Sequence, residues 1–363
     1  MRLFLCGDVM TGRGIDQILP HPSNVILYEP YLVDARDYVD LAEKKNGPIP
    51  RRVDSKYIWG EALEELDRAA IDARIVNLET AITAAETNWP DKGIHYRMHP
   101  KNIDCLAAAQ IDVCVLANNH VLDWGHGGLS ETLRTLDAAQ IARAGAGENA
   151  QQAAAPAIVD LASKGRVLVF SVGSTSSGIP REWATGEDSA GVNLLSTLSE
   201  EAAARLAIEI RKFQQPGDIV LVSIHWGNNW GHEIPREQIA FAHRLIEEGV
   251  AVVHGHSSHH TKAIEVFRRR LILYGCGDFL TDYEGISGYE KFRSDIAVMY
   301  LLELNRTGEL ISARLVPMRM HRFRLERSPQ ADAESLCKLL NEFGARFKTA
   351  AKLEDKQNLF LRW

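Results

Sequence analysis

The stretch VAVVHGHSSHHTK, residues 250–262, decides the fold class of this chain. Its apolar run, Val250–Val253, leads directly into four histidines: His254, His256, His259 and His260. A short apolar run of this kind is typical of a fully buried parallel strand, and ligands in open α/β sheets gather where such strands end. Histidine is a common metal ligand, so four of them at a strand end predict a metal site. The alternative interpretation is a cluster of hydrogen-bonded loop histidines.

The composition of the 363-residue chain is that of an ordinary globular protein, with 45% hydrophobic and 25% charged residues. Its formal net charge of -7 gives no general attraction for nucleic acid or anionic membranes, so we expect neither as a partner. No apolar segment is long enough for a membrane anchor, and the run in MRLFLCGD is too short for a signal peptide, so we expect a cytoplasmic protein. Five widely spaced cysteines without a CxxC pair are typical of reduced, buried thiols. The oligomeric state is not predicted.

Each of five expected strands ends in a side chain that can bind a metal ion. These side chains are Asp8, Glu79, Asn119, His225 and the pair His256 and His259. Each alone has an ordinary explanation as a helix cap or turn residue, but together at one sheet edge they predict a metal centre. The mixture of carboxylate, amide and imidazole suits Mn²⁺, Fe²⁺ or Zn²⁺. Six donors exceed the needs of one tetrahedral ion, so we expect two divalent metal ions as the cofactors.

The order of the expected elements predicts an α/β protein with two sheets. Strands and helices alternate over the first two thirds of the chain, β-hairpins follow, and no linker-like segment separates them. We therefore expect a single domain over residues 1–363, with an insertion loop at about residues 17–56 and a C-terminal helix at about residues 330–350. Residues 57–70 are expected to form one amphipathic helix. A long irregular excursion is usually functional, and whether residues 17–53 form a lid is left open.

Six short motifs, in this order and spacing, resemble the CapA family of poly-γ-glutamate capsule synthesis proteins, which belongs to the calcineurin-like metallophosphoesterase superfamily. The motifs are GDVMTGR, NLET, NNHVLDWG, HWG, GHSSH and YGCGDF, and the resemblance covers roughly residues 3–325. It implies an α/β fold in four layers, a metallophosphoesterase-like sandwich of two mixed β-sheets flanked by helices. It also implies a two-metal site at the sheet edges.

The same resemblance implies a role for each motif residue. Asp8 matches the carboxylate ligand of the first strand, Glu79 the bridging carboxylate and Asn119 the amide ligand. The imidazole ligands correspond to His225, His256 and His259. The catalytic histidine corresponds to His120, which Asp123 would orient.

Four positions depart from the expected family pattern. Met10 stands where phosphoesterases have a histidine, and Glu79 stands where they have an aspartate. Asn229 lies near the place of a glutamate that often follows HWG, and the GDF at Asp278 replaces the commoner GNF. We therefore expect fewer protein ligands for the first metal ion.

The function that the resemblance implies is a metal-dependent, hydrolase-like enzyme acting on a peptide or a γ-glutamyl polymer. Arg13, Arg97 and Arg181 are candidates for a basic groove that binds such an anionic substrate. The same site would also suit a peptide epimerase, in which Trp226 and Trp230 would line a peptide pocket. A phosphoesterase and a non-catalytic polymer-binding subunit are the two remaining hypotheses.

Overall fold

The histidine stretch follows a buried parallel strand, as the sequence predicts. A computed structural model describes residues 1–355 and 357–363. In it, β13 (Val252–His256) pairs in parallel with β12 (Ile219–His225) on one side and with β15 (Arg270–Leu273) on the other. Every residue of β12 and β13 is buried.

These strands form the centre of a seven-stranded mixed sheet with the order β11-β9-β12-β13-β15-β14. The other strands are β8 (Ala157–Asp160), which pairs with β9, then β9 (Arg166–Ser174), β11 (Leu194–Leu195) and β14 (Ile264–Phe267). The two outer strands β8 and β14 run antiparallel to their neighbours. β14 and β15 form one of the β-hairpins expected in the last third of the chain.

The second large sheet has ten strands and is also mixed, with the order β20-β21-β18-β17-β1-β2-β5-β6. Its parallel strands are β1 (Arg2–Val9), β2 (Ala73–Leu78), β5 (Val113–Val115), β6 (Ala142–Ala144) and β16 (Asp278–Leu280). Its antiparallel strands are β17 (Ile296–Leu304), β18 (Leu310–Met320), β19 (Leu325–Arg327), β20 (Ala350–Glu354) and β21 (Asn358–Arg362). Two small pairs complete the strands: β3 (Ala81–Ile82) with β4 (Arg97–Met98), and β7 (Ala146–Gly147) with β10 (Gly191–Val192).

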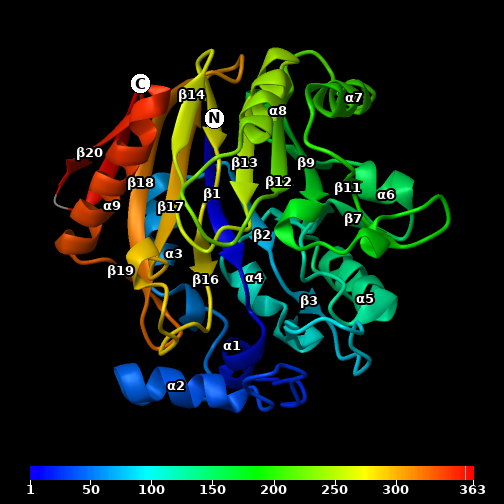
Figure 1. Cartoon of the computed structure of the whole chain (residues 1–363), viewed down its shortest axis with the longest axis vertical. Helices are drawn as coiled ribbons and strands as arrows, with labels where there is room; N and C mark the ends of the chain where they lie inside the picture. The colour runs from blue at the N-terminus through cyan, green and yellow to red at the C-terminus, as the bar shows by residue number, and fades with distance from the viewer. Residues whose placement is uncertain (356) are drawn as a thin grey trace.

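The two large sheets pack face to face, and helices cover their outer faces (Figure 1). The helices are α1 (Arg13–Ile18), α2 (Arg36–Asn46), α3 (Ala62–Ala69), α4 (Asp104–Ala108), α5 (Gly125–Ala138), α6 (Ala150–Ala154), α7 (Glu200–Arg211), α8 (Arg236–Glu247) and α9 (Gln330–Gly344). Helices α7 and α8 cover the seven-stranded sheet, while α3, α4 and α5 cover the ten-stranded one. The expected four-layer α/β sandwich of two mixed sheets is confirmed.

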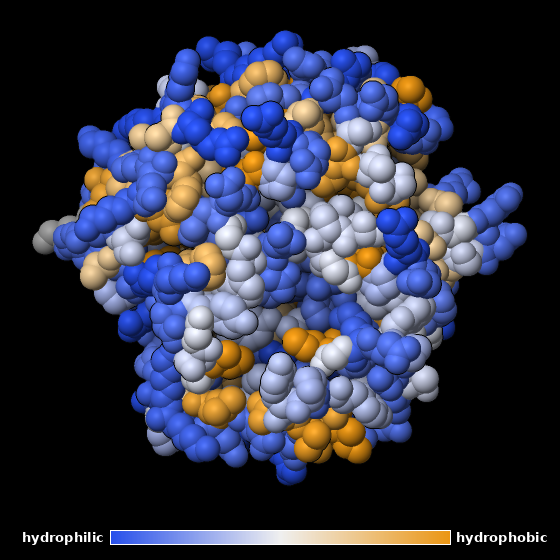
Figure 2. All heavy atoms as spheres, viewed as in Figure 1, coloured by the Kyte–Doolittle hydropathy of each residue, from blue (hydrophilic) through white to orange (hydrophobic). Residues whose placement is uncertain are grey.

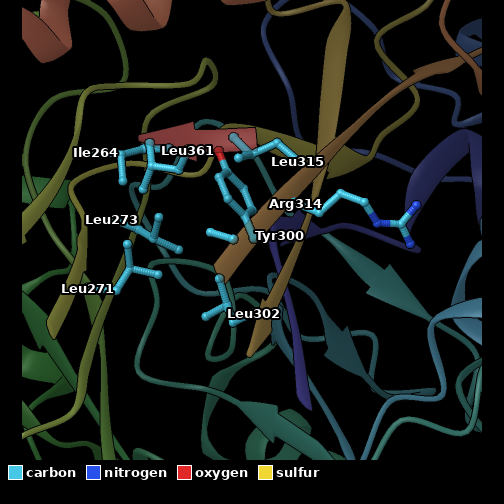
Figure 3. Close-up of a pocket in the computed structure, with 9 residues that line it drawn as sticks. Ile264, Leu271, Leu273, Tyr300, Leu302, Arg314, Leu315 and Leu361 are labelled. Carbon is cyan, nitrogen blue, oxygen red and sulfur yellow. The ribbon is translucent and has the colours of Figure 1, made fainter. Parts of the chain in front are cut away.

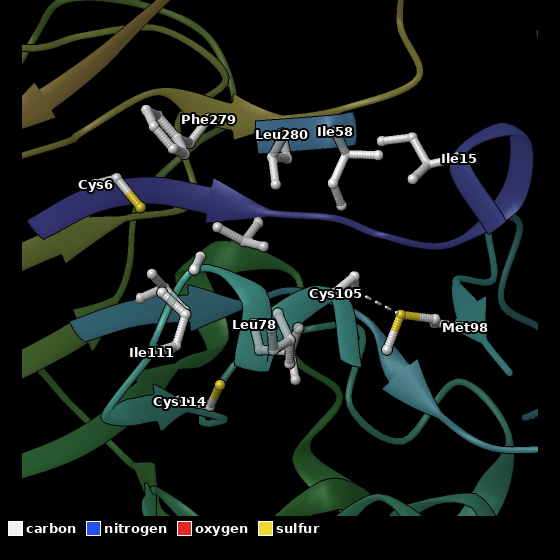
Figure 4. Close-up of a cluster of buried hydrophobic side chains, with 14 of the residues drawn as sticks. Cys6, Ile15, Ile58, Leu78, Met98, Cys105, Ile111, Cys114, Phe279 and Leu280 are labelled. Carbon is white, nitrogen blue, oxygen red and sulfur yellow. Dashed lines mark hydrogen bonds between the residues drawn. The ribbon is translucent and has the colours of Figure 1, made fainter. Parts of the chain in front are cut away.

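Alternation along the strands divides the core of the two large sheets into three large apolar clusters. In β1, Leu3 and Leu5 face the other sheet, while Phe4 and Cys6 face the helices, because successive strand residues point to opposite faces. Figure 3 shows the interior between the sheets, where Leu271 and Leu273 lie opposite Tyr300 and Leu302. Figure 4 shows the helix side of β1, where sulfur-containing and aliphatic side chains fill the layer.

The structure corrects three expectations about individual elements. The helix expected at residues 57–70 is divided into a 3-10 turn, Tyr57–Trp59, and α3, because Gly60 between them adopts φ 46° with ψ -125°, a non-helical combination that requires glycine. The excursion after α1 contains α2 and is not wholly irregular. The C-terminal hairpin of β20 and β21 was not expected at all.

Helices of the described residues are all too short or too polar to cross a lipid bilayer.

Candidate metal centre

Strands from both sheets end at one place in the molecule. The strands β1, β2, β12 and β13 run in the same direction, and their ends meet near the middle of the view in Figure 1. The surface is hollowed below these strand ends, and hydrophobic patches border the hollow toward α1 and α2 (Figure 2). The carboxyl ends of parallel strands are where α/β proteins place their ligands.

Two overlapping groups of side chains converge at these strand ends. In the first group, one ligand atom each from Asp8, His225 and His256 lies within 4.8 Å of the other two. In the second group, carboxylate oxygens of Asp8, Glu79 and Asp278 satisfy the same condition. Asp8 belongs to both groups and therefore joins them. All five side chains are buried.

Several polar atoms of the site are buried without a hydrogen-bond partner among the described residues. They are Asp8 Oδ2, Asp278 Oδ2 and His225 Nε2; Asn119 Oδ1, in the loop after β5, is also buried without such a partner. A buried polar atom without a partner costs free energy, and unpaired acceptors are what a cation would satisfy. The residues present therefore fit a divalent metal ion.

The electrostatics of the site also favour a bound cation. Burial, followed by the charge of Asp278, raises the pKa of Asp8 to about 7. Burial, Asp8 and Asp278 likewise raise the pKa of Glu79 well above its ordinary value. Three neighbouring carboxylates repel one another, and a bound cation reverses this effect.

Neighbouring side chains hold the ligand candidates in place. Asn77 donates a hydrogen bond to Asp8 Oδ1 at 2.7 Å, and Asn118 donates to Asn77 at 3.0 Å. His225 Nε2 lies 3.8 Å from Glu79 Oε1, and His256 Nδ1 lies 3.9 Å from Asp8 Oδ1. At these distances the imidazole nitrogens and carboxylate oxygens are not hydrogen-bonded to each other. Their metal-binding atoms nevertheless converge on the same small region.

His120 lies on the other side of Glu79, with His120 Nε2 4.0 Å from Glu79 Oε1. Its Nδ1 atom is 2.6 Å from Asp123 Oδ2, and its ring stacks on Tyr96 with 3.9 Å between ring centroids. Since a carboxylate only accepts, the Nδ1–H donates to Asp123 and the Nε2 atom carries the lone pair. The expected His120–Asp123 pair is therefore present in the structure.

Lys92 joins this pair from the loop after β3. Its Nζ lies 2.6 Å from Asp123 Oδ1 and 3.1 Å from His120 Nδ1. Burial, followed by the charge of Lys92, lowers the pKa of His120 well below its ordinary value. The imidazole is thus neutral at pH 7, with its lone pair facing the carboxylate group.

His259 contacts Asp278 at the edge of the site but belongs to neither of the two ligand groups. Its Nδ1 atom is 3.0 Å from Asp278 Oδ1, and its Nε2 atom is 3.1 Å from the Asn229 amide. Although burial opposes it, the charge of Asp278 raises the pKa of His259. The two other histidines of the opening stretch, His254 and His260, are buried and lie outside both groups.

Two of the three arginines expected to bind an anionic substrate, Arg13 and Arg97, are buried structural residues, whereas Arg181 is exposed. The Arg13 guanidinium pairs with Asp282 at 2.5 Å and with Glu29 at 3.1 Å. Arg97 donates to the Ala85 carbonyl oxygen at 2.6 Å and packs over the Trp124 ring. Their hydrogen-bonding groups are used inside the protein, so both are withdrawn from the substrate-binding set.

The two expected pocket tryptophans differ in position. Trp226 is a core residue, 1% exposed, whose Nε1–H donates to the Tyr274 carbonyl oxygen, so its assignment to a peptide pocket is also withdrawn. Trp230 is half-buried, stacks on the exposed Tyr289 with 3.9 Å between ring centroids, and lies 5.3 Å from the His259 ring. Trp230 therefore remains a candidate wall of the site.

Sequence reasoning missed two residues of the site. Asp278 entered the sequence analysis only through its GDF motif and not as a ligand; it begins β16 after the chain crosses from one sheet to the other at Gly275–Gly277. Lys92 was missed because it lies in an irregular loop whose residues carry no periodic pattern. The GDF motif was the available signal for Asp278, and the sequence offered none for Lys92.

The fold and the site together define a class: an α/β sandwich of two sheets with carboxylates and histidines clustered at its strand ends. The chain matches the family described as bacterial capsule synthesis protein, PGA_cap, over residues 2–283. The chain belongs to this family.

Individual relatives agree with the family match. The chain is 46% identical over 347 residues to a probable polyglutamine synthesis accessory protein of Mycobacterium tuberculosis (strain CDC 1551 / Oshkosh), covering 95% of this chain and 91% of that protein. It is 26% identical over 317 residues to the PGA biosynthesis protein CapA of Bacillus subtilis (strain 168), covering 87% and 70%. Among solved structures, a 5′-nucleotidase precursor from Thermus thermophilus aligns with a TM-score of 0.49 and 13% identity, covering 93% of this chain and 58% of that one.

Proposed function

We propose that the chain is a metal-dependent enzyme that hydrolyses or transfers an amide bond of a peptide or γ-glutamyl substrate. The observation that carries the proposal is the pair of overlapping ligand groups joined by Asp8, with buried acceptors that lack a partner among the described residues. The ligands proposed for two divalent ions are Asp8, Glu79, Asn119, His225, His256, His259 and Asp278. Paired divalent ions activate a carbonyl group and a water molecule when bound.

The chain supplies the proton-transfer group. His120 presents a neutral Nε2 lone pair toward the carboxylate group, and this atom accepts a proton from the attacking water. The resulting imidazolium then gives the proton to the leaving amine. Asp123 holds the ring in this tautomer through Nδ1–H, and Lys92 holds Asp123. His120 and Asp123 therefore act as one unit, with Lys92 keeping the imidazole neutral between turnovers.

The proposed substrate class rests on the relatives. Two of them are named for polyglutamine synthesis and for PGA biosynthesis, and polymers of glutamate are joined by amide bonds. The burial of Arg13 and Arg97 means that an anionic polymer is held by other groups. Trp230 and His259 at the rim of the site are the groups proposed to contact it.

The proposal is tested with metal-loaded protein and three substrate classes: γ-glutamyl oligomers, α-linked peptides and phosphoesters. We expect cleavage or transfer of the γ-glutamyl amide bond, lost on His120→Gln and kept on His126→Gln, which changes an exposed histidine at the start of α5. Preferential phosphoester cleavage would replace the amide proposal with a phosphoesterase. Metal-independent binding of the polymer without turnover would identify a binding subunit.

A further inference from the structure

A continuous chain of hydrogen bonds runs from β1 to the metal-centre histidines. His254 Nε2 lies 2.7 Å from the Cys6 carbonyl oxygen, and His254 Nδ1 lies 3.1 Å from Ser223 Oγ. Ser223 Oγ lies 2.8 Å from His256 Nε2, and His256 Nδ1 lies 2.7 Å from His225 Nδ1. All five residues are fully buried, so this chain of hydrogen bonds is shielded from bulk water.

Strand register places these side chains together. Ser223 pairs with His254, and His225 pairs with His256, in the parallel ladder of β12 and β13. Residues two apart on a strand point to the same face, so all four side chains project from one face of the sheet. That face is turned toward β1, which is why the chain can end on the Cys6 carbonyl oxygen of the other sheet.

With the histidine rings neutral, the Cys6 carbonyl oxygen determines where each proton lies in this chain of hydrogen bonds. A carbonyl oxygen only accepts, so His254 carries its proton on Nε2 and its Nδ1 atom accepts from the Ser223 hydroxyl. Ser223 Oγ in turn accepts from His256 Nε2–H, which leaves the lone pair of His256 on Nδ1. His256 Nδ1 accepts from His225 Nδ1–H, which leaves the lone pair of His225 on Nε2. The His225 Nε2 lone pair is therefore free, whereas the His256 Nδ1 lone pair is shared with His225 Nδ1–H and becomes available to a metal ion only when that hydrogen bond opens.

We propose that Ser223 and His254 are positioning residues that fix the tautomers of His256 and His225, so that the lone pairs lie on His256 Nδ1 and His225 Nε2, the ring atoms nearest the carboxylates of the metal centre. This inference rests on the proposed function, since it concerns the same site. The His225 lone pair already faces Glu79, 3.8 Å away, and has no hydrogen-bond partner among the described residues. The second partner of a ligating histidine commonly sets its tautomer and its affinity for metal.

Tautomers measured by ¹⁵N NMR in metal-free wild-type protein test this inference without any variant. We expect Nε2–H tautomers for His254 and His256 and an Nδ1–H tautomer for His225. A proton on His256 Nδ1 in the metal-free protein would overturn the inference. This readout does not depend on metal binding, so a protein that binds no metal would refute the proposed function while the tautomers still decide the inference.

Metal affinity of matched serine variants gives the second test. Ser223→Ala removes the hydroxyl that joins the two histidines, and we expect Mn²⁺ or Zn²⁺ affinity to fall by about 10–100-fold in calorimetric titration. Ser171→Ala is the control, because Ser171 is the buried register neighbour of Ser223 on β9 and takes no part in the chain of hydrogen bonds. Its affinity should stay within about twofold of wild type, and Ser223→Thr should restore much of the loss. Equal affinities for Ser223→Ala and Ser171→Ala would contradict the inference.

Discussion

Asp8 and Asp278 are register partners in the parallel pair β1–β16, although they lie far apart in the sequence. The fold forces these two carboxylates together, because β16 enters the ten-stranded sheet beside β1 after the chain leaves β15 in the other sheet. Burial and the charge of Asp278 raise the pKa of Asp8 to about 7. The carboxylate cluster is therefore an unfavourable arrangement that a bound cation would convert into a favourable one.

The raised pKa of Asp8 predicts a pH-dependent stability in metal-free protein. Because the folded-state pKa of about 7 exceeds the ordinary 3.8, the contribution of Asp8 is fully present at low pH and is lost as pH rises from about 4 to about 7. Asp8→Asn cannot ionise at this position. We therefore expect the difference in unfolding free energy between Asp8→Asn and wild type to grow by about 2 to 3 kcal/mol, in favour of the variant, as the pH is raised from 5 to 8.

Urea denaturation of both proteins in the presence of a chelator measures this difference. Taking the difference between variant and wild type cancels the buried histidines, whose lowered pKa values act in the opposite direction. A difference that stays constant from pH 5 to pH 8 would show that Asp8 does not titrate in this range.

Gly7→Ala is expected to disrupt the site from the backbone. A Cβ atom at Gly7 would lie 1.6 Å from the Gly277 carbonyl oxygen, which accepts the hydrogen bond of the Asp8 N–H at 3.0 Å. The strands must separate to relieve this contact, so we expect a loss of several kcal/mol in unfolding free energy and weaker metal binding.

Gly127→Ala is the matched control for that variant. Gly127 is exposed in α5 with no atom within 4 Å of an added Cβ, so alanine should stabilise the helix by about 0.5–1 kcal/mol. Thermal unfolding of both variants checks the pair. Similar melting temperatures for Gly7→Ala and wild type would contradict the close approach of β1 and β16.

The buried ion pair of Arg13 with Asp282 is expected to stabilise the folded chain and to take no part in binding substrate. Arg13→Met leaves the carboxylates of Asp282 and Glu29 buried without their partner, and we expect a loss of about 3–5 kcal/mol in urea denaturation. The exposed pair of Arg36 with Asp34 provides the control, since Arg36→Met should cost less than about 1 kcal/mol. Equal losses for the two variants would contradict this interpretation of Arg13.

Lys92 is expected to lower the pKa of His120 through its charge. Lys92→Met removes that charge, so the pKa of His120 should rise, and the acidic limb of the pH–activity profile should move to higher pH. Lys92→Arg keeps the charge and should leave the limb close to its wild-type position. Histidine titration by NMR provides the same readout without a substrate. An unchanged pKa for His120 in Lys92→Met would show that the contact with Lys92 has no electrostatic effect.

Strand-end residues were the predictable part of the site. Asp8, Glu79, His225 and His256 each follow an apolar strand, and the carboxyl ends of parallel strands meet at one edge, so the sequence alone indicated that they converge. The two-sheet sandwich followed from the same alternation of elements, together with the family resemblance.

Long-range partners were the unpredictable part. The expectation that Arg13 binds substrate was wrong because Arg13 pairs with Asp282. Asp282 lies far away in the sequence, and no local pattern reveals that pairing. Trp226 was misassigned because an aromatic residue after a strand suits a pocket and a core equally well, and only packing against Phe241 and Tyr274 distinguishes them. Asp278 was left out of the ligand set because only the pairing of β16 with β1 brings it beside Asp8, and no local sequence pattern encodes that pairing.

The metal content of protein purified without chelator tests the central claim most directly. We predict about two transition-metal ions per chain in wild type, a loss of metal in Asp8→Ala, whose carboxylate belongs to both ligand groups, and full retention in Asp137→Ala, which changes an exposed carboxylate of α5. Circular dichroism would confirm that both variants are folded. Substoichiometric metal in wild type that does not change in Asp8→Ala would contradict the metal centre, and with it the proposed enzyme.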